Sequence, residues 1–156
     1  MKKRLIVFLI ALIIAIVVIC IISKDEESFI EPNDAYYKSE SNNNSILANR
    51  GSFSWSDGTK YLVADAIGPT AMNYDVTLNV KENEIVYFEN VEGIIKSVYI
   101  YDAKDKEDVK LDYSITFDAR EKYIVVPELI GEYIVEINTL CDKGEVWYSI
   151  KLNINE

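Results

Sequence analysis

The chain has 156 residues, with 16 Lys and Arg against 26 Asp and Glu, and a formal net charge of −10. This length favours a single domain, and the acidic balance excludes the basic footprint that nucleic-acid phosphates need. The sequence contains no His, which removes the usual general base, the usual zinc ligand and the Ser-His-Asp triad together.

The first 22 residues differ in kind from the rest of the chain. Three cations in residues 1–4 precede eighteen uncharged residues at 5–22, and an acidic flank follows. At about 1.5 Å per residue this stretch makes roughly 27 Å of helix, close to the hydrocarbon thickness of a bilayer. We therefore expect a cytoplasmic tail at 1–4 and a single transmembrane helix at 5–22 in the cell membrane. By the positive-inside rule, everything after residue 22 lies outside the cytoplasm.

Two alternatives to an uncleaved anchor stay open. A secretory signal peptide has an apolar run of about 7–15 residues and a small-x-small site, which the residues before Ser23 do not offer. Lipidation of Cys20 requires a small residue before the cysteine, and Ile19 stands there. Outside the membrane segment Cys141 is the one cysteine, so no disulfide is expected within the domain.

Residues 23–49 predict a tether that joins the anchor to a folded domain at residues 50–156. The tether is rich in Ser, Asn and acidic residues and shows no sustained hydrophobic period. A flexible coil of this length spans about 30 Å, enough to lift a domain off the lipid headgroups. Phe29-Ile30 and Tyr36-Tyr37 are the tether residues that can dock onto the domain.

From residue 51 onward the hydrophobic pattern has period two, which predicts β-strands. Phe53 and Trp55 alternate with serines before Asp57-Gly58, a strong signal for a two-residue hairpin turn. Such a turn places Phe53 opposite Leu62. The expected core face of this hairpin carries Phe53, Trp55, Leu62 and Ala64.

Further strand-like stretches follow along the chain, separated by turn signals. They lie at residues 74–80, 84–89, 94–101, 109–117, 122–126, 132–140 and 145–155. Helical periodicity is absent after the anchor, with a weak exception at residues 67–72. Eight or nine short strands in about 105 residues predict an all-β, immunoglobulin-like two-sheet sandwich.

The Gly131-Glu132-Tyr133 motif precedes the predicted penultimate strand. It resembles the tyrosine corner of immunoglobulin-like sandwiches, in which the tyrosine hydroxyl bonds a backbone group a few residues upstream. The motif therefore agrees with the fold class that the strand pattern predicts.

The stretch RGSFSWSDG at residues 50–58 resembles the opening of a group of small surface domains of low-GC Gram-positive bacteria. Those domains stand behind a lipoprotein signal or a membrane helix, continue to an Asp and a Pro, here Asp65 and Pro69, and close on Gly-x-Tyr and an alternating strand. The resemblance covers most of residues 50–156. It implies a membrane-tethered, extracytoplasmic location and this fold, and it implies no activity.

The sequence offers few residues for chemistry, and we expect no catalytic residue and no cofactor. Cys141 has no His to activate it, whereas carboxylate-only chemistry stays open. Asp102, Asp105 and Asp108 are weak candidates for a calcium site. Their loop lacks the EF-hand spacing and carries three lysines, so a solvated loop is the alternative.

Tyr99, Tyr101 and Trp147 fall on strand faces opposite the apolar residues beside them. They either pack in a second layer or form an exposed binding patch. We expect a non-catalytic binding or accessory domain that presents such a face, or an edge strand, to a protein or to the cell wall. A carboxylate-dependent enzyme acting on the cell wall, or a regulatory partner that pairs through the transmembrane helix, are the alternatives.

Overall fold

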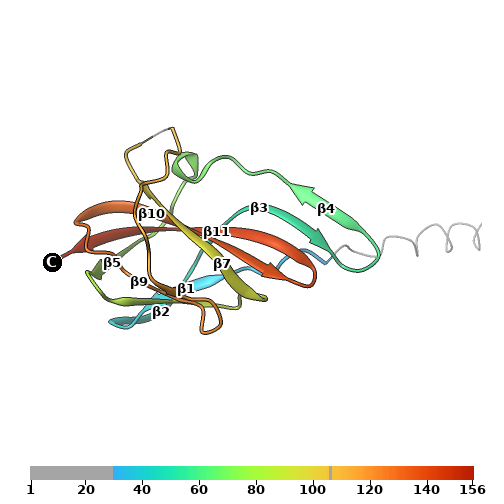
Figure 1. Ribbon diagram of the computed structural model, residues 1–156, viewed down its shortest axis with the longest axis horizontal. Helices are drawn as coiled ribbons and strands as arrows, with labels where there is room; N and C mark the ends of the chain where they lie inside the picture. The colour runs from blue at the N-terminus through green and yellow to red at the C-terminus, as the bar shows by residue number, and fades with distance from the viewer. Residues whose placement is uncertain (1–29, 106) are drawn as a thin grey trace, which may run out of the picture. The chain divides into compact units, whose positions relative to one another are not determined.

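Two β-sheets face each other in the computed structural model, which describes residues 30–105 and 107–156 (Figure 1). The all-β, two-sheet sandwich that the sequence predicts is confirmed. The tail predicted at 1–4, the transmembrane helix predicted at 5–22 and the first part of the tether lie outside the described residues. In the part that is described, no helix combines the length and apolarity that crossing a bilayer requires.

The first sheet, sheet A, has the strand order β2-β1-β6-β9-β8, and all of its pairs are antiparallel. Its strands are β1 (Tyr36–Ser39), β2 (Asn42–Leu47), β6 (Ile85–Glu89), β8 (Phe117–Asp118) and β9 (Tyr123–Val125).

The second sheet, sheet B, has the order β4-β3-β11-β10-β7. Its strands are β3 (Asn49–Ser56), β4 (Tyr61–Ala64), β7 (Ile94–Asp102), β10 (Gly131–Cys141) and β11 (Gly144–Asn155). The antiparallel β3 pairs with the first half of β11, and β5 (Thr77–Lys81) pairs in parallel with the second half. Along the same edge of β11, the pairing partner therefore changes from β3 to β5 between Ser149 and Lys151.

The C-terminal hairpin supplies a larger share of the core than any other hairpin, as its alternating sequence predicts. Every inward residue of β11 is buried, namely Val146, Tyr148, Ile150, Leu152 and Ile154. At the tight turn into β11, Gly144 has a φ of 145°, and a Cβ there would lie 1.9 Å from the Ser54 carbonyl oxygen. At the start of β10 the Tyr133 hydroxyl donates to the Ile130 carbonyl oxygen at 3.3 Å, the bond expected of a tyrosine corner.

The predicted boundary between tether and domain, at residues 49 and 50, is wrong. Residues 31–49 belong to the folded unit, which begins at Glu31 rather than at residue 50. Within them β1 pairs with both β2 and β6, and Ala35, Tyr37 and Ala48 are buried. The sequence does not reveal this hairpin, because its composition is polar. An edge hairpin needs only a few buried side chains once its backbone is paired.

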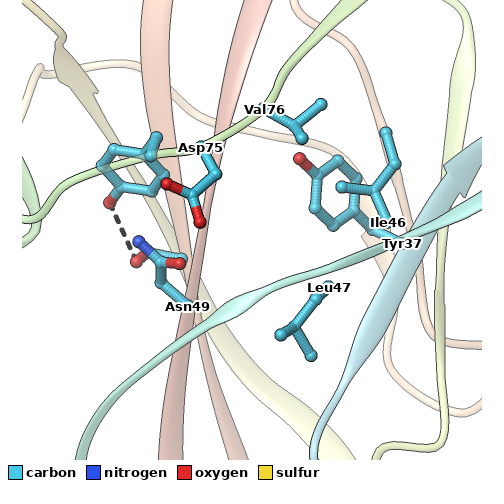
Figure 2. A pocket seen from close by; sticks show the side chains of 8 residues that line it. Tyr37, Ile46, Leu47, Asn49, Asp75 and Val76 are labelled. Atoms are coloured by element: carbon cyan, nitrogen blue, oxygen red, sulfur yellow. Dashed lines mark hydrogen bonds between the residues drawn. The ribbon is translucent and has the colours of Figure 1, made fainter.

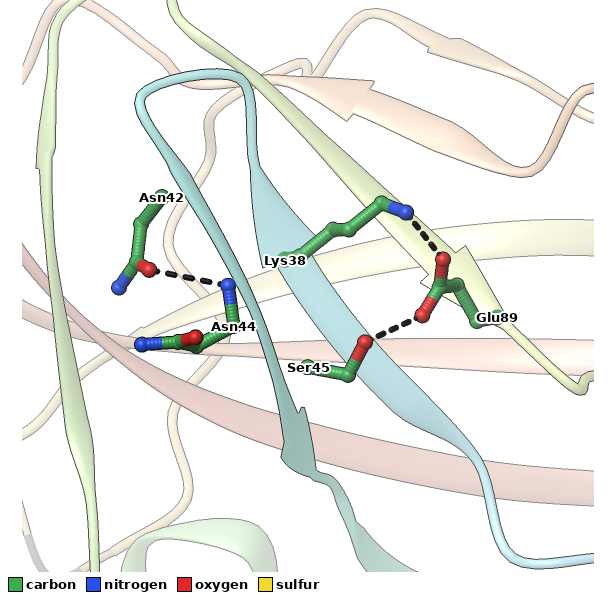
Figure 3. Close-up of polar contacts among 5 residues, drawn as sticks. All are labelled: Lys38, Asn42, Asn44, Ser45 and Glu89. Carbon is green, nitrogen blue, oxygen red and sulfur yellow. Dashed lines mark hydrogen bonds and ion pairs between the residues drawn. The ribbon is translucent and has the colours of Figure 1, made fainter.

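Glu89 of β6 ties both strands of this hairpin to the sheet (Figure 3). Its carboxylate forms an ion pair with Lys38 of β1 and accepts a bond from the Ser45 hydroxyl of β2 at 2.5 Å. The Lys38 hydrogen bond is the main reason that the pKa of Glu89 is lowered. On β2 the Asn44 backbone N–H donates to the Asn42 side-chain oxygen at 3.0 Å.

The β3–β4 hairpin forms with a longer turn than predicted. Asp57 Oδ1 accepts the backbone N–H groups of Thr59 and Lys60, each at 2.9 Å, so four residues make the turn. Trp55 then lies opposite Leu62 instead of opposite Lys60. The shift of two residues preserves the predicted face, but only Trp55 on it is fully buried, whereas Leu62 is 37% exposed.

The strand predicted at residues 109–117 is mostly wrong. Only its end forms β8, and an isolated bridge joins Lys110 to Tyr101. Val109 and Tyr113 are exposed. Alternation gives this stretch the pattern of a strand. A strand also needs the backbone of a neighbouring strand to pair with, and this stretch pairs only at Lys110 and at its end. The weak helical signal at residues 67–72 corresponds to a 3₁₀ turn, η1 (Pro69–Ala71).

Candidate functional site

The three aromatic residues predicted as a binding patch share the outer face of sheet B. Tyr99 and Tyr101 lie on β7 and Trp147 on β11, with β10 between them. The rings of Tyr99 and Trp147 stack at 5.9 Å with an interplanar angle of 23°. The Lys110 ammonium lies 3.3 Å from the Tyr99 ring centroid. Tyr101 is only 2% exposed, which removes it from any exposed patch.

Two loop segments, residues 65–76 and the described residues 103–105 and 107–112, form a covering layer over this face (Figure 1). Asp108 joins them, because its Oδ1 accepts the Thr70 backbone N–H at 2.8 Å and the Thr70 hydroxyl at 2.6 Å. The segments approach so closely that a Cβ at Gly68 would lie 1.6 Å from the Asp108 carboxylate. Tyr101 is therefore packed in a second layer, whereas Tyr99 and Trp147 are half-buried beside it.

A half-buried carboxylate lies beneath the covering layer. The Tyr101 hydroxyl donates to Glu136 Oε2 at 2.8 Å. Burial raises the pKa of Glu136, and nearby Asp108 adds to the rise, while the Tyr101 bond and Lys110 act against it. Burial and the bond to Glu136 also raise the pKa of Tyr101. Glu136 and Tyr101 are thus each other's hydrogen-bond partners, which is typical of a structural network.

The predicted metal candidates do not converge. Asp102 Oδ1 and Asp105 Oδ1 each accept a backbone N–H of their own loop at 2.9 Å, from Lys104 and Glu107 respectively. Asp108 instead accepts a hydrogen bond from the Thr70 backbone N–H. In residues 30–105 and 107–156, no three His, Cys, Asp or Glu side chains are grouped to hold an ion. Cys141 is a half-buried free thiol.

An open cleft of about 170 Å³ lies beside the covering layer, at the point where the edge of β11 passes from β3 to β5 (Figure 2). Eight residues line it: Tyr37, Ile46, Leu47, Asn49, Tyr74, Asp75, Val76 and Ser149. Tyr74 closes one end, since its hydroxyl donates to the Pro69 carbonyl oxygen at 2.9 Å and lies 2.9 Å from Ser149 Oγ. No sequence pattern predicts this cleft, because its lining comes from five separate segments.

A third feature is the outer strand of sheet B. β4 ends the strand order, so one edge of its backbone is unpaired within the described part of the chain (Figure 1). Its residues are apolar and yet exposed: Tyr61 by 67%, Leu62 by 37% and Val63 by 55%. Edge strands of stable monomers are usually short, charged or covered, and β4 is protected only by its shortness.

The chain matches no protein-family model, no curated protein and no solved structure.

Proposed function

We propose that this chain is a membrane-anchored, extracytoplasmic binding domain without catalytic activity, and that it binds by pairing the free edge of β4 with a strand of a second copy. The observation that carries this proposal is the uncharged, exposed edge strand Tyr61–Ala64. The anchor and the location rest on the apolar stretch at residues 5–22 and the cations before it.

Strand addition suits β4 chemically. An added strand satisfies the free backbone N–H and C=O groups, and side chains on alternate faces give the contact its specificity. Tyr61 and Val63 share one face of β4, and Leu62 and Ala64 share the other. Burying these exposed side chains removes apolar surface from water, at about 25 cal/mol for each Å².

A second copy of the chain is the partner that the charges favour. Lys60 and Asp65 flank β4 directly. In an antiparallel pairing that places Leu62 opposite Val63 of the other copy, Lys60 faces Asp65 at both ends. Residues 31–156 carry 12 Lys and Arg against 23 Asp and Glu in total, so most other surfaces of two copies repel each other. The contact is isologous, and a closed dimer satisfies it.

The strand order supports the immunoglobulin-like part of the expectation. Sheet A contains β1-β6-β9-β8, which follows the A-B-E-D order of an immunoglobulin sheet, and β11-β10-β7 follows G-F-C. The segment that contains β2 to β5, from Asn42 to Lys81, is then an insertion between strands A and B. The cysteine pair of antibody domains has no counterpart, since Cys141 is the one cysteine in residues 31–156.

The geometry gives less support to a carboxylate-dependent enzyme. Glycosidases need two carboxyl groups that face each other about 5–9.5 Å apart. Among the described residues that line the cleft beside the covering layer, Asp75 carries the one carboxyl group. A second cleft of about 190 Å³ lies between the 113–116 segment and residues 125–128. Among its described lining residues, Glu128 carries the one carboxyl group. A regulatory role through the transmembrane helix rests on residues outside the described part.

Sedimentation of the full chain in density-matched detergent tests the proposal. We expect a reversible monomer–dimer equilibrium for the native chain. Val63→Lys places a charge in the paired strand and raises the dimer dissociation constant at least tenfold. Val109→Lys is the matched control, because Val109 is 53% exposed and Val63 55%, and it leaves the equilibrium unchanged. A native chain that stays monomeric, or equal effects of the two substitutions, contradicts strand pairing.

A further inference from the structure

Tyr37 has a buried ring and a hydroxyl with no partner. Its side chain is 2% exposed, and burial raises its pKa to about 12. Two other tyrosines whose pKa is raised to about 12 use their hydroxyls: Tyr148 donates to the Asn33 carbonyl oxygen at 2.7 Å, and Tyr74 donates to Pro69. Among the described residues, the fully buried side-chain polar atoms that lack a partner are Trp55 Nε1 and Asn138 Oδ1, so the Tyr37 hydroxyl is reached by solvent and is open to an external partner.

The Tyr37 hydroxyl is directed into the cleft between β2 and the 74–76 segment. Figure 2 shows it facing the Asp75 carboxylate from the opposite side, with Leu47 and Asn49 below. Asp75 is exposed and accepts no hydrogen bond within the described residues. Two polar groups without partners therefore face the same space.

The remaining lining is made of acceptors and apolar walls. The Asn49 amide Nδ2 donates to the Asn73 carbonyl oxygen at 2.7 Å, which leaves its Oδ1 as an acceptor. Ile46, Leu47 and Val76 supply the apolar walls. Among the described residues, no Lys, Arg or His lines the cleft, and its charged side chain is that of Asp75. This arrangement attracts a cation that carries hydrogen-bond donors and repels an anion.

The size of the cleft limits its occupant. Its volume is about 170 Å³. Pockets for drug-sized molecules measure about 300–1,000 Å³, so this cleft suits one side chain rather than a whole small molecule. A lysine side chain combines an aliphatic stem with an ammonium group that has three donors. Its stem matches the apolar walls, and its donors match Asp75, Asn49 Oδ1 and the Tyr37 hydroxyl oxygen.

We propose that the cleft bounded by Tyr37, Leu47, Asn49, Asp75 and Val76 is a recognition site for a lysine side chain of a partner polypeptide. The ammonium group donates one hydrogen bond to the Asp75 carboxylate, one to Asn49 Oδ1 and one to the Tyr37 hydroxyl oxygen. The stem lies between Leu47 and Val76. The site is separate from β4 and does not depend on strand pairing.

The test uses the full chain in detergent micelles and the peptide acetyl-Gly-Gly-Lys-Gly-Gly-amide. We expect saturable shifts of the Asn49 side-chain amide resonance in nuclear magnetic resonance spectra. Peptides with norleucine or acetyl-lysine in place of lysine have the stem without the charge, and at least tenfold weaker binding is expected for each. Equal binding of the norleucine peptide overturns the proposal. Equal binding of an arginine peptide overturns the assignment to lysine.

Three variants locate the binding in the cleft. Asp75→Asn is expected to weaken lysine-peptide binding at least tenfold, whereas Asp142→Asn, an exposed aspartate in the β10–β11 turn, leaves it unchanged. Tyr37→Phe is expected to weaken binding several-fold without lowering the thermal midpoint, because its hydroxyl has no partner to lose. Unchanged affinity in Asp75→Asn, or a Tyr37→Phe variant that unfolds more easily and binds normally, overturns the site.

Discussion

The two hairpins at the start of the folded unit differ in composition and in fate. The β1–β2 hairpin is rich in Asn and Ser and yet lies within sheet A, with Tyr37 buried and Glu89 bonded to both of its strands. The β3–β4 hairpin has an apolar second strand that stays exposed. Composition alone therefore does not predict which of the two hairpins is buried. A strand is buried when the opposite sheet covers it, and an apolar strand without cover is a candidate contact surface.

The largest effect that this comparison predicts is the loss of the fold on removal of residues 31–49. The fragment 50–156 lacks the β1–β2 hairpin, so the edge of β6 and the buried surfaces around Tyr37 and Ala48 are open to water. We expect fragment 31–156 to unfold cooperatively and fragment 50–156 to show no cooperative transition by circular dichroism. A stable 50–156 fragment would mean that the hairpin is an accessory tether after all.

Within the second hairpin, Trp55 and Leu62 stand opposite each other on one face. Trp55 is 1% exposed, so Trp55→Ala is expected to cost about 3–5 kcal/mol of unfolding free energy. Leu62 is 37% exposed, and Leu62→Ala is expected to cost less than about 1 kcal/mol. Urea denaturation of the two variants measures both values. Similar losses would place β4 in the core and remove the basis for strand pairing.

The chain continues from β4 into the covering layer, where a smaller, pH-dependent effect is expected. The folded-state pKa of Glu136 is raised above its ordinary value of 4.5, mainly by burial. The folded state therefore binds this proton more tightly than the unfolded state, and stability falls as pH rises from about 4.5 through the raised pKa. Glu136→Gln removes this loss, so its stability relative to the native chain should increase from pH 4 to pH 7.

Urea midpoints of the native chain and Glu136→Gln across that pH range provide the measurement. Glu145→Gln is a suitable comparison, because the Lys96 hydrogen bond lowers the pKa of Glu145 and the expected trend has the opposite sign. A pH-independent difference for Glu136→Gln would mean that water reaches Glu136 beneath the covering layer.

The sequence predicted the sandwich because alternation along β10 and β11 is set by burial on one face. It missed β1 and β2 because β1 pairs with β6, about fifty residues further along the chain, and so distant a partner leaves no local pattern. It placed Tyr99, Tyr101 and Trp147 correctly on one face. The covering layer over them was not predictable, since it depends on the contact of Asp108 with Gly68 and Thr70 across two loops.

A charge exchange across β4 tests the proposed strand pairing most directly. Lys60→Asp alone puts two aspartates together at each end of the paired strands, and Asp65→Lys alone puts two lysines there. Each single variant is expected to raise the dimer dissociation constant in sedimentation. The double variant Lys60→Asp, Asp65→Lys restores opposite charges at both ends, and its dissociation constant is expected to return to within about threefold of the native value, a difference below about 0.7 kcal/mol. Effects of the two single variants that add up in the double variant, instead of cancelling, would contradict the pairing of β4 with a second copy.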